Sequence, residues 1–127
     1  MEKRILVIDD DESFLRMIAR VLQLEGYKVE TAKTGKEAIE KSNQDSYNLA
    51  IIDLRLPDMD GTDLLTAMRE TKPRMVKIML TGHVSPGDKA EAIKMNADAY
   101  LVKPIGTIDL LRTIKEHLER QTAETNT

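Results

Sequence analysis

Four short apolar runs, each followed at once by a polar side chain, constrain this chain more than any other feature. The runs cover residues 5–8, 49–52, 76–80 and 99–102, and segments with helical apolar spacing lie between them. Short runs of this kind, rich in β-branched residues, are typical of strands that are buried on both faces of a parallel sheet. Strands that alternate with helices imply right-handed crossovers, so the sequence predicts an α/β domain with helices on both faces of one sheet.

A fifth run, residues 28–32, differs from the others because polar and apolar side chains alternate along it. Alternation is expected of a strand at the edge of a sheet. The pattern therefore favours a flavodoxin-like (βα)5 doubly wound fold with strand order 2-1-3-4-5, in which strands 1 and 3 flank the point where the winding reverses. The carboxyl ends of strands 1, 3, 4 and 5 then meet at one rim, where open sheets of this kind bind ligands.

Capping residues place the ends of the expected helices. Asp11 precedes the first helix, which Gly26 closes. Thr34 and Asp60 are expected at the start of the second and third helices, and Ser85, followed by proline, at the start of the fourth.

Apolar stripes predict which side of each helix faces the sheet. In the first helix, Leu15 and Leu22 lie away from the centre of the stripe, so we expect them to be partly exposed. The stripes consist of Phe14, Met17, Ile18 and Val21 in the first helix, of Ala90, Ala92, Ile93 and Met95 in the fourth, and of Ile108, Leu111, Ile114 and Leu118 in the last.

Size and composition exclude several classes of function. With 127 residues, of which 41% are hydrophobic, the chain is the size of one domain, which we expect over residues 1–121, with 122–127 as a polar tail or the start of a linker. A net charge of -3 and an aromatic content of 3% argue against direct nucleic acid or membrane binding. Because there is no cysteine and no signal-peptide pattern, we expect a cytoplasmic protein without thiol chemistry.

The residues that follow the strands form a pattern suited to phosphoryl transfer. Asp9, Asp10 and Asp53 would share one crevice, where each close pair of carboxylates repels by roughly 4 kcal/mol at about 4 Å and an effective dielectric near 20. A hard cation, Mg²⁺ or Mn²⁺ in its place, would relieve this repulsion with oxygen ligands alone. Thr81 and Lys103 add a hydroxyl and a positive charge, so Asp53 is predicted to be a nucleophile that forms an aspartyl phosphate.

Four motifs in this order and spacing resemble the receiver domain of two-component response regulators. The resemblance covers about residues 3 to 120, and the joint signature is specific although each motif alone is weak. The motifs are Ile8-Asp9-Asp10, Ile52-Asp53 with Pro57 and Gly61 following, Leu80-Thr81-Gly82, and Val102-Lys103-Pro104.

The resemblance implies a role for each residue of the rim. Asp53 would accept a phosphoryl group from a phosphohistidine of a sensor histidine kinase or of a histidine phosphotransfer protein. Asp10, Asp53 and the main-chain carbonyl of Arg55 would bind Mg²⁺, and Asp9 would hold the metal through water. Thr81 and Lys103 would hold the phosphoryl oxygens, and the Lys103-Pro104 peptide bond would be cis.

The same resemblance implies a conformational switch. Thr81 would move toward the phosphoryl group and Tyr100 would turn inward, which would change the surface formed by helix 4, strand 5 and helix 5. Arg55 and His83 occupy positions that tune the lifetime of the aspartyl phosphate in this family. Homodimer formation through that surface on phosphorylation is a further hypothesis.

Three other functions remain as alternatives to a signalling domain that assists its own phosphorylation and dephosphorylation. A phosphatase of the haloacid dehalogenase type also uses a strand-end aspartate, but it places a second aspartate two positions later, where this chain has Arg55. A flavodoxin-like cofactor protein is disfavoured by the acidic rim, which would repel an FMN phosphate, and a receiver-like scaffold without chemistry by the presence of every expected site residue.

Overall fold

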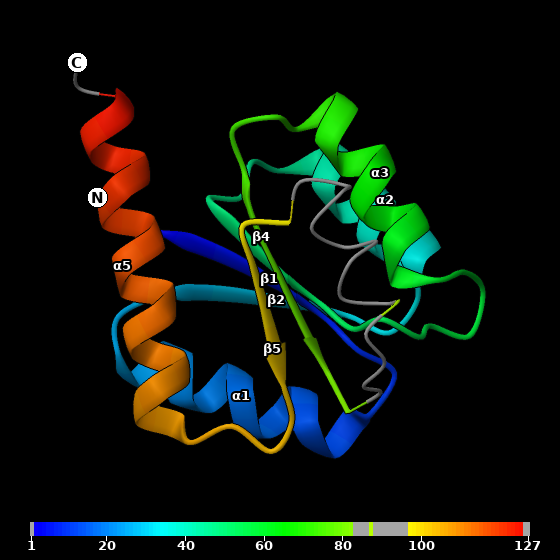
Figure 1. Cartoon of the computed structure of the whole chain (residues 1–127), viewed down its shortest axis with the longest axis horizontal. Helices are drawn as coiled ribbons and strands as arrows, with labels where there is room; N and C mark the ends of the chain where they lie inside the picture. Colours follow the sequence, from blue (N-terminus) through cyan, green and yellow to red (C-terminus); the bar gives the residue numbers. More distant parts are fainter. Residues whose placement is uncertain (1, 83–86, 88–96, 126–127) are drawn as a thin grey trace.

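Five strands and four helices make up the part of the chain that the structure, a computed structural model, describes: residues 2–82, 87 and 97–125. The predicted fourth helix, with Ser85 at its cap, falls on residues outside this part, so no element is labelled α4. The strands are β1 (Arg4–Ile8), β2 (Lys28–Ala32), β3 (Leu49–Ile52), β4 (Val76–Thr81) and β5 (Ala99–Val102), and the helices are α1 (Glu12–Leu24), α2 (Gly35–Gln44), α3 (Gly61–Thr71) and α5 (Thr107–Thr125) (Figure 1).

The strands form one parallel sheet in the order β2-β1-β3-β4-β5, which confirms the predicted topology. Parallel strands need crossovers, and the helices supply them on both faces of the sheet. Figure 1 shows α1 and α5 on one side of the strands and α2 and α3 on the other. No described helix is long and apolar enough to cross a bilayer.

Each face of the sheet has its own core, because successive side chains of a strand point to opposite faces. Ile5 and Val7 of β1 pack toward α1 and α5, while Leu6 and Ile8 pack toward α2 and α3. All residues of β1 after Arg4, and all of β3 and β4, are buried, as expected for inner strands of a parallel sheet.

The apolar stripe predicted for α1 was partly wrong, although Ile18 is buried and Phe14 and Val21 are partly buried as expected. Leu15 and Leu22, expected to be partly exposed, are buried with Ile18 against the sheet, whereas Met17 is 49% exposed. In the last helix, Ile114 and Leu118 are buried and Leu111 is partly buried, as predicted, but Ile108 is 73% exposed and Leu110 is buried in the core instead. Both helices carry two overlapping apolar stripes, and the packing against the sheet selects one of them.

The caps explain where the helices begin and end. The Asp11 carboxylate accepts a hydrogen bond from the Phe14 N–H, and the Thr34 hydroxyl accepts one from the Glu37 N–H, as expected for both. Gly26 follows α1 with a φ of 94°, a left-handed conformation that favours glycine. Asp60 precedes α3 but makes no side-chain cap hydrogen bond. Helix α5 continues past the proposed boundary at residue 121, which itself stays a prediction.

Candidate functional site

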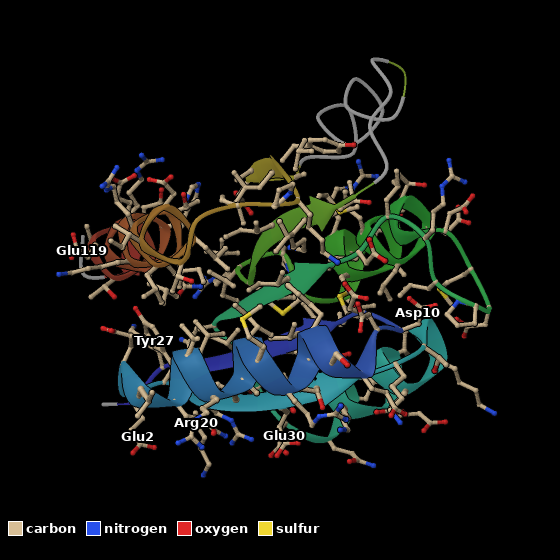
Figure 2. All side chains as sticks on the ribbon, turned by 90° about the horizontal axis from the view of Figure 1, so that it is seen from below. Glu2, Asp10, Arg20, Tyr27, Glu30 and Glu119 are labelled. Atoms are coloured by element: carbon tan, nitrogen blue, oxygen red, sulfur yellow. The ribbon has the colours of Figure 1, made fainter. Side chains whose placement is uncertain are left out.

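Main-chain hydrogen bonds between neighbouring strands continue for one residue beyond the ends of β1 and β3. They fix the positions of Asp9 and Asp53, which follow these strands. The Asp53 N–H donates to the carbonyl of Ile8 at 2.9 Å, and the Asp9 N–H donates to the carbonyl of Ala32 at 3.0 Å. Asp53 is 6% exposed and Asp9 is 2% exposed, although both are carboxylates. Asp10, one residue further, lies at the surface, and Figure 2 shows it at the end of the molecule opposite Tyr27.

Asp9, Asp10 and Asp53 come together as the sequence predicts. Each offers one carboxylate oxygen, and these oxygens lie within 4.8 Å of one another. Asp53 Oδ1 is buried and accepts no hydrogen bond from any described residue. A buried polar atom without a partner is costly, so this oxygen is open to a ligand that supplies positive charge.

The pKa of Asp53 is raised above its usual value of 3.8. Burial is the main cause, and repulsion from the Asp9 carboxylate adds to it. The Lys103 ammonium, a hydrogen bond from the Thr81 side chain and one from the Leu54 backbone act in the opposite direction. The folded protein therefore holds the ionised Asp53 at a cost, which a bound cation would lower.

Lys103 reaches the rim from the end of β5. Its Nζ donates to Asp9 Oδ2 at 2.6 Å and lies 4.1 Å from the centroid of the Phe14 ring. The Lys103 N–H donates to the carbonyl of Thr81 at 2.8 Å, and the Lys103–Pro104 peptide bond is cis. Phe14 belongs to the predicted apolar stripe of α1, and nothing in the sequence pattern indicates its contact with a lysine so distant in the chain.

The other predicted residues lie around this centre. Thr81 is fully buried at the end of β4, and Tyr100 is partly buried and packs against the core cluster beneath α2 and α3. Arg55 is exposed on the loop after Asp53 and forms an isolated bridge with Asp60. His83, predicted to tune the phosphoryl lifetime, lies outside the described residues.

The loop that follows Asp53 is attached to two helices. The Asp58 carboxylate accepts hydrogen bonds from the Gly35 N–H at 2.8 Å and the Lys36 N–H at 2.9 Å, at the start of α2. The Gly61 N–H donates to the carbonyl of Leu54. Sequence reasoning did not single out Asp58, because an aspartate between a proline and a glycine also fits an ordinary turn. These bonds keep the loop in place beside the rim.

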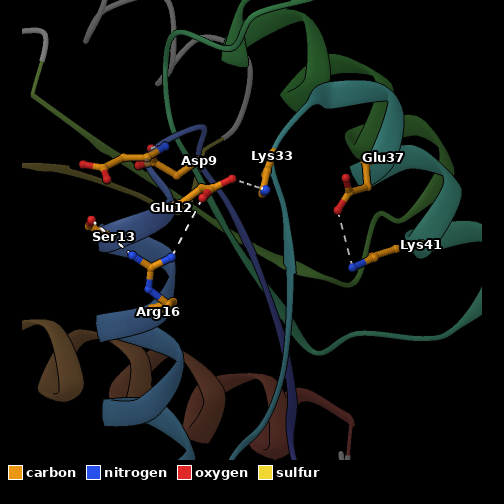
Figure 3. Close-up of polar contacts among 8 residues, drawn as sticks. Asp9, Glu12, Ser13, Arg16, Lys33, Glu37 and Lys41 are labelled. Carbon is orange, nitrogen blue, oxygen red and sulfur yellow. Dashed lines mark hydrogen bonds and ion pairs between the residues drawn. The ribbon is translucent and has the colours of Figure 1, made fainter.

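Glu12, a further acidic residue near the rim, has partners of its own. Its carboxylate is ion-paired with Lys33 and, at 3.9 Å, with Arg16, as Figure 3 shows beside Asp9. The hydrogen bond from Lys33 and its charge lower the pKa of Glu12. Among the described residues, the cluster of carboxylates able to hold a metal consists of Asp9, Asp10 and Asp53.

We expect the substitution Asp53→Asn to raise the free energy of unfolding when no divalent metal is present, because it removes a buried charge. Since the pKa of Asp53 is higher in the folded than in the unfolded chain, wild-type stability falls as the pH rises from the usual carboxyl value of 3.8 through the raised value. The gain in free energy of unfolding of the variant over the wild type should therefore be absent below the usual carboxyl pKa. It should reach its full size above the raised pKa.

Urea unfolding in EDTA at a series of pH values measures this difference. Glu116→Gln, on the exposed side of α5, is the matched control, because it makes the corresponding change from acid to amide at an exposed position. An Asp53→Asn variant that is less stable than the wild type at neutral pH would contradict the inference that the ionised Asp53 destabilises the folded protein.

Known proteins are similar to this chain in sequence and in fold. A model of the response regulator receiver domain family matches residues 5–115. The alkaline phosphatase synthesis transcriptional regulatory protein PhoP of Bacillus subtilis is 33% identical over 120 residues, which are 94% of this chain and 50% of PhoP. The chain thus spans about half the length of the curated relatives it matches.

Solved structures agree with these sequence matches. A CheY-like response regulator receiver domain protein from Methanospirillum hungatei JF-1 superimposes with a TM-score of 0.95 at 43% identity, over 98% of this chain and 99% of that chain. The beryllofluoride-activated NtrC4 receiver domain dimer has a TM-score of 0.88 at 36% identity, over 93% and 98% of the two chains. Since the family model spans most of the chain and the fold that carries the acidic rim is shared in full, this chain belongs to the response regulator receiver domains, which act as phosphorylation-controlled signalling modules.

Proposed function

We propose that Asp53 is the phosphoacceptor of this receiver domain and that the acidic cluster binds Mg²⁺ beside it. The observation that supports this most is Asp53 Oδ1, which is buried and accepts no hydrogen bond from a described residue, in a carboxylate that clusters with those of Asp9 and Asp10. Such an oxygen is suited to attack phosphorus because hydrogen bonds do not occupy it. Its neighbours are the hard donors that Mg²⁺ prefers.

The proposed metal ligands are the carboxylates of Asp10 and Asp53 and the main-chain carbonyl of Arg55, with Asp9 acting through water. The donor set fits Mg²⁺, or Mn²⁺ in its place, because it consists of oxygens only. When bound, the ion neutralises negative charge on the carboxylates and on the phosphoryl oxygens. The hydrogen bonds of Asp58 to α2 support the loop that carries Arg55.

The proposed reaction is a phosphoryl transfer from a phosphohistidine of a sensor histidine kinase or a histidine phosphotransfer protein. An Asp53 carboxylate oxygen forms a bond to phosphorus while the bond from phosphorus to the imidazole nitrogen breaks, and the imidazole leaves with the electron pair. The Lys103 ammonium and the Thr81 hydroxyl donate hydrogen bonds to the phosphoryl oxygens. The site thereby assists its own phosphorylation and, with water as the nucleophile, its own dephosphorylation.

The proposed switch begins with the oxygens of the new phosphoryl group. These oxygens carry about two negative charges, in place of the single charge of the carboxylate, and they are acceptors that attract the hydroxyl of Thr81. We expect Tyr100 to fill the space that Thr81 leaves, with Arg55 and His83 tuning the lifetime. Val102 and Ile108 are exposed on β5 and α5, so they supply apolar area for the proposed output surface and for a phosphorylation-dependent homodimer.

The test uses acetyl phosphate as a small phosphodonor, with labelling followed by intact-protein mass spectrometry. With Mg²⁺, the wild type should gain the mass of one phosphoryl group, and the gain should disappear in EDTA and in Asp53→Asn. Asp63→Asn, at an exposed aspartate on α3, should be labelled as the wild type is. Labelling that persists in Asp53→Asn, or that ignores Mg²⁺, would overturn the proposal.

A further inference from the structure

The ammonium of Lys103 contacts both a carboxylate and an aromatic ring. Asp9 Oδ2 is 2.6 Å from Nζ, and the centroid of the Phe14 ring is 4.1 Å from it. At this distance a lysine ammonium is attracted to the face of an aromatic ring. Lys103 therefore has two partners of different kinds at the rim.

The start of α1 holds the ring in its place. The Phe14 N–H donates to Asp11 Oδ1 at 3.1 Å, and the Asp11 N–H donates to Asp9 Oδ1 at 2.9 Å. Phe14 also packs, partly buried, against the core cluster beneath α1 and α5. One turn of chain thus orients both partners of the ammonium, the Asp9 carboxylate and the Phe14 ring.

We propose that Phe14 is a positioning residue for Lys103 in the phosphorylation reaction, an inference that rests on the function proposed above for Asp53. The ring keeps the ammonium at the rim while its hydrogen bond passes from Asp9 to the phosphoryl oxygens. A lysine stem is long and flexible, so an unsupported Lys103 would lose more rotamer freedom whenever it reaches the phosphoryl group.

A ring suits this task better than a second carboxylate. The cation–π attraction is not a hydrogen bond, so it does not occupy the N–H donors that must reach the phosphoryl oxygens. An additional anion beside Lys103 would compete with the phosphoryl group for the ammonium and would repel it. The ring can therefore remain in contact with Lys103 both before and after the transfer.

The first measurement tests the contact without any phosphodonor. In NMR spectra of the wild type, the ε protons of Lys103 should be shifted upfield by the ring current of Phe14. The shift should be lost in Phe14→Leu and kept in Phe14→Tyr. Wild-type ε protons with the shift of an ordinary exposed lysine would overturn the inference.

The second measurement is the initial rate of labelling by acetyl phosphate at saturating Mg²⁺. Phe14→Leu should be labelled about two- to tenfold more slowly than the wild type, which corresponds to the usual strength of such a contact, and Phe14→Tyr should restore the rate. In a Lys103→Met background, the change from Phe14 to Leu should have no further effect. The partly buried Val21, replaced by alanine on the same helix, controls for lost packing and should be labelled at the wild-type rate.

The outcomes separate this inference from the proposed function. Labelling of Asp53 that is as fast in Phe14→Leu as in the wild type, or faster, would overturn only the role of Phe14. The same holds if Phe14→Tyr is as slow as Phe14→Leu, or if the effect of Phe14→Leu persists in Lys103→Met, because both results would indicate packing alone. A wild type that is not labelled at Asp53 would instead overturn the proposed function, while the ring-current shift would still report the contact.

Discussion

Gly61→Ala is expected to lower the free energy of unfolding by about 3 kcal/mol, the upper part of the usual range for overpacking. A Cβ atom at residue 61 would lie 2.1 Å from the carbonyl oxygen of Asp53 and 2.9 Å from the Cα of Leu54. Both are main-chain atoms, so no flexible side chain can move aside to accept the methyl group. Because small domains are stable by only about 5–15 kcal/mol, the loss is a large part of the total.

The same substitution should also slow phosphorylation of the molecules that remain folded, because relief of the clash must move the main chain at Asp53. Urea unfolding gives the free energy, and labelling by acetyl phosphate gives the rate. Gly106→Ala is the matched control, since a Cβ there would meet only the Asp109 carboxylate, at an ordinary 3.5 Å. A Gly61→Ala variant as stable as Gly106→Ala would contradict the close approach of the chain at Asp53.

Lys103→Met should lower the free energy of unfolding by about 2 kcal/mol at neutral pH, because it leaves a buried carboxylate without its partner. The side chain of Asp9 is 3% exposed and that of Lys103 is 25% exposed, so the full cost of breaking a buried ion pair does not apply. Loss of the ammonium should also reduce labelling of Asp53. Among the described residues, no other lysine forms an ion pair with Asp9.

A second substitution separates the two effects of Lys103. Asp9→Asn in the Lys103→Met background should recover most of the lost stability, because the uncompensated charge is gone, but it should not recover labelling. Lys33→Met is the matched control, because its ion pair with Glu12 is half exposed and such pairs contribute about 0–1 kcal/mol. Equal stability of Lys103→Met and the wild type would show that the Asp9–Lys103 pair makes no net contribution.

The fold was accessible from the sequence because its signals are local. The β-branched run of β3 and the alternating run of β2 distinguish inner from edge strands without any knowledge of their neighbours. The alternating run marks β2 as one edge, but the apolar run of β5 does not reveal that this strand forms the other edge, with Val102 39% exposed. The side of a helix that faces the sheet was harder to predict from the sequence. Leu15 and Met17 are both apolar, and only contact with the sheet decides that Leu15 is buried.

Some features of the site were likewise predictable from the sequence, and others were not. Which residues gather at the rim follows from their places at the ends of parallel strands, so the approach of Asp9, Asp10 and Asp53 was predictable from the sequence. The unpartnered state of Asp53 Oδ1 was not predictable, because it depends on every group packed around that atom.

The sequence by itself determined the sheet, its order and the set of polar residues at its rim, because strand and helix periodicities are properties of short segments. Only the tertiary structure decided that Lys103 contacts both Asp9 and Phe14, and that Gly61 leaves no room for a side chain beside the Asp53 carbonyl. The physical reason is distance along the chain. Contacts between segments far apart in the sequence depend on how whole elements pack, and no local pattern specifies that packing at the scale of single atoms.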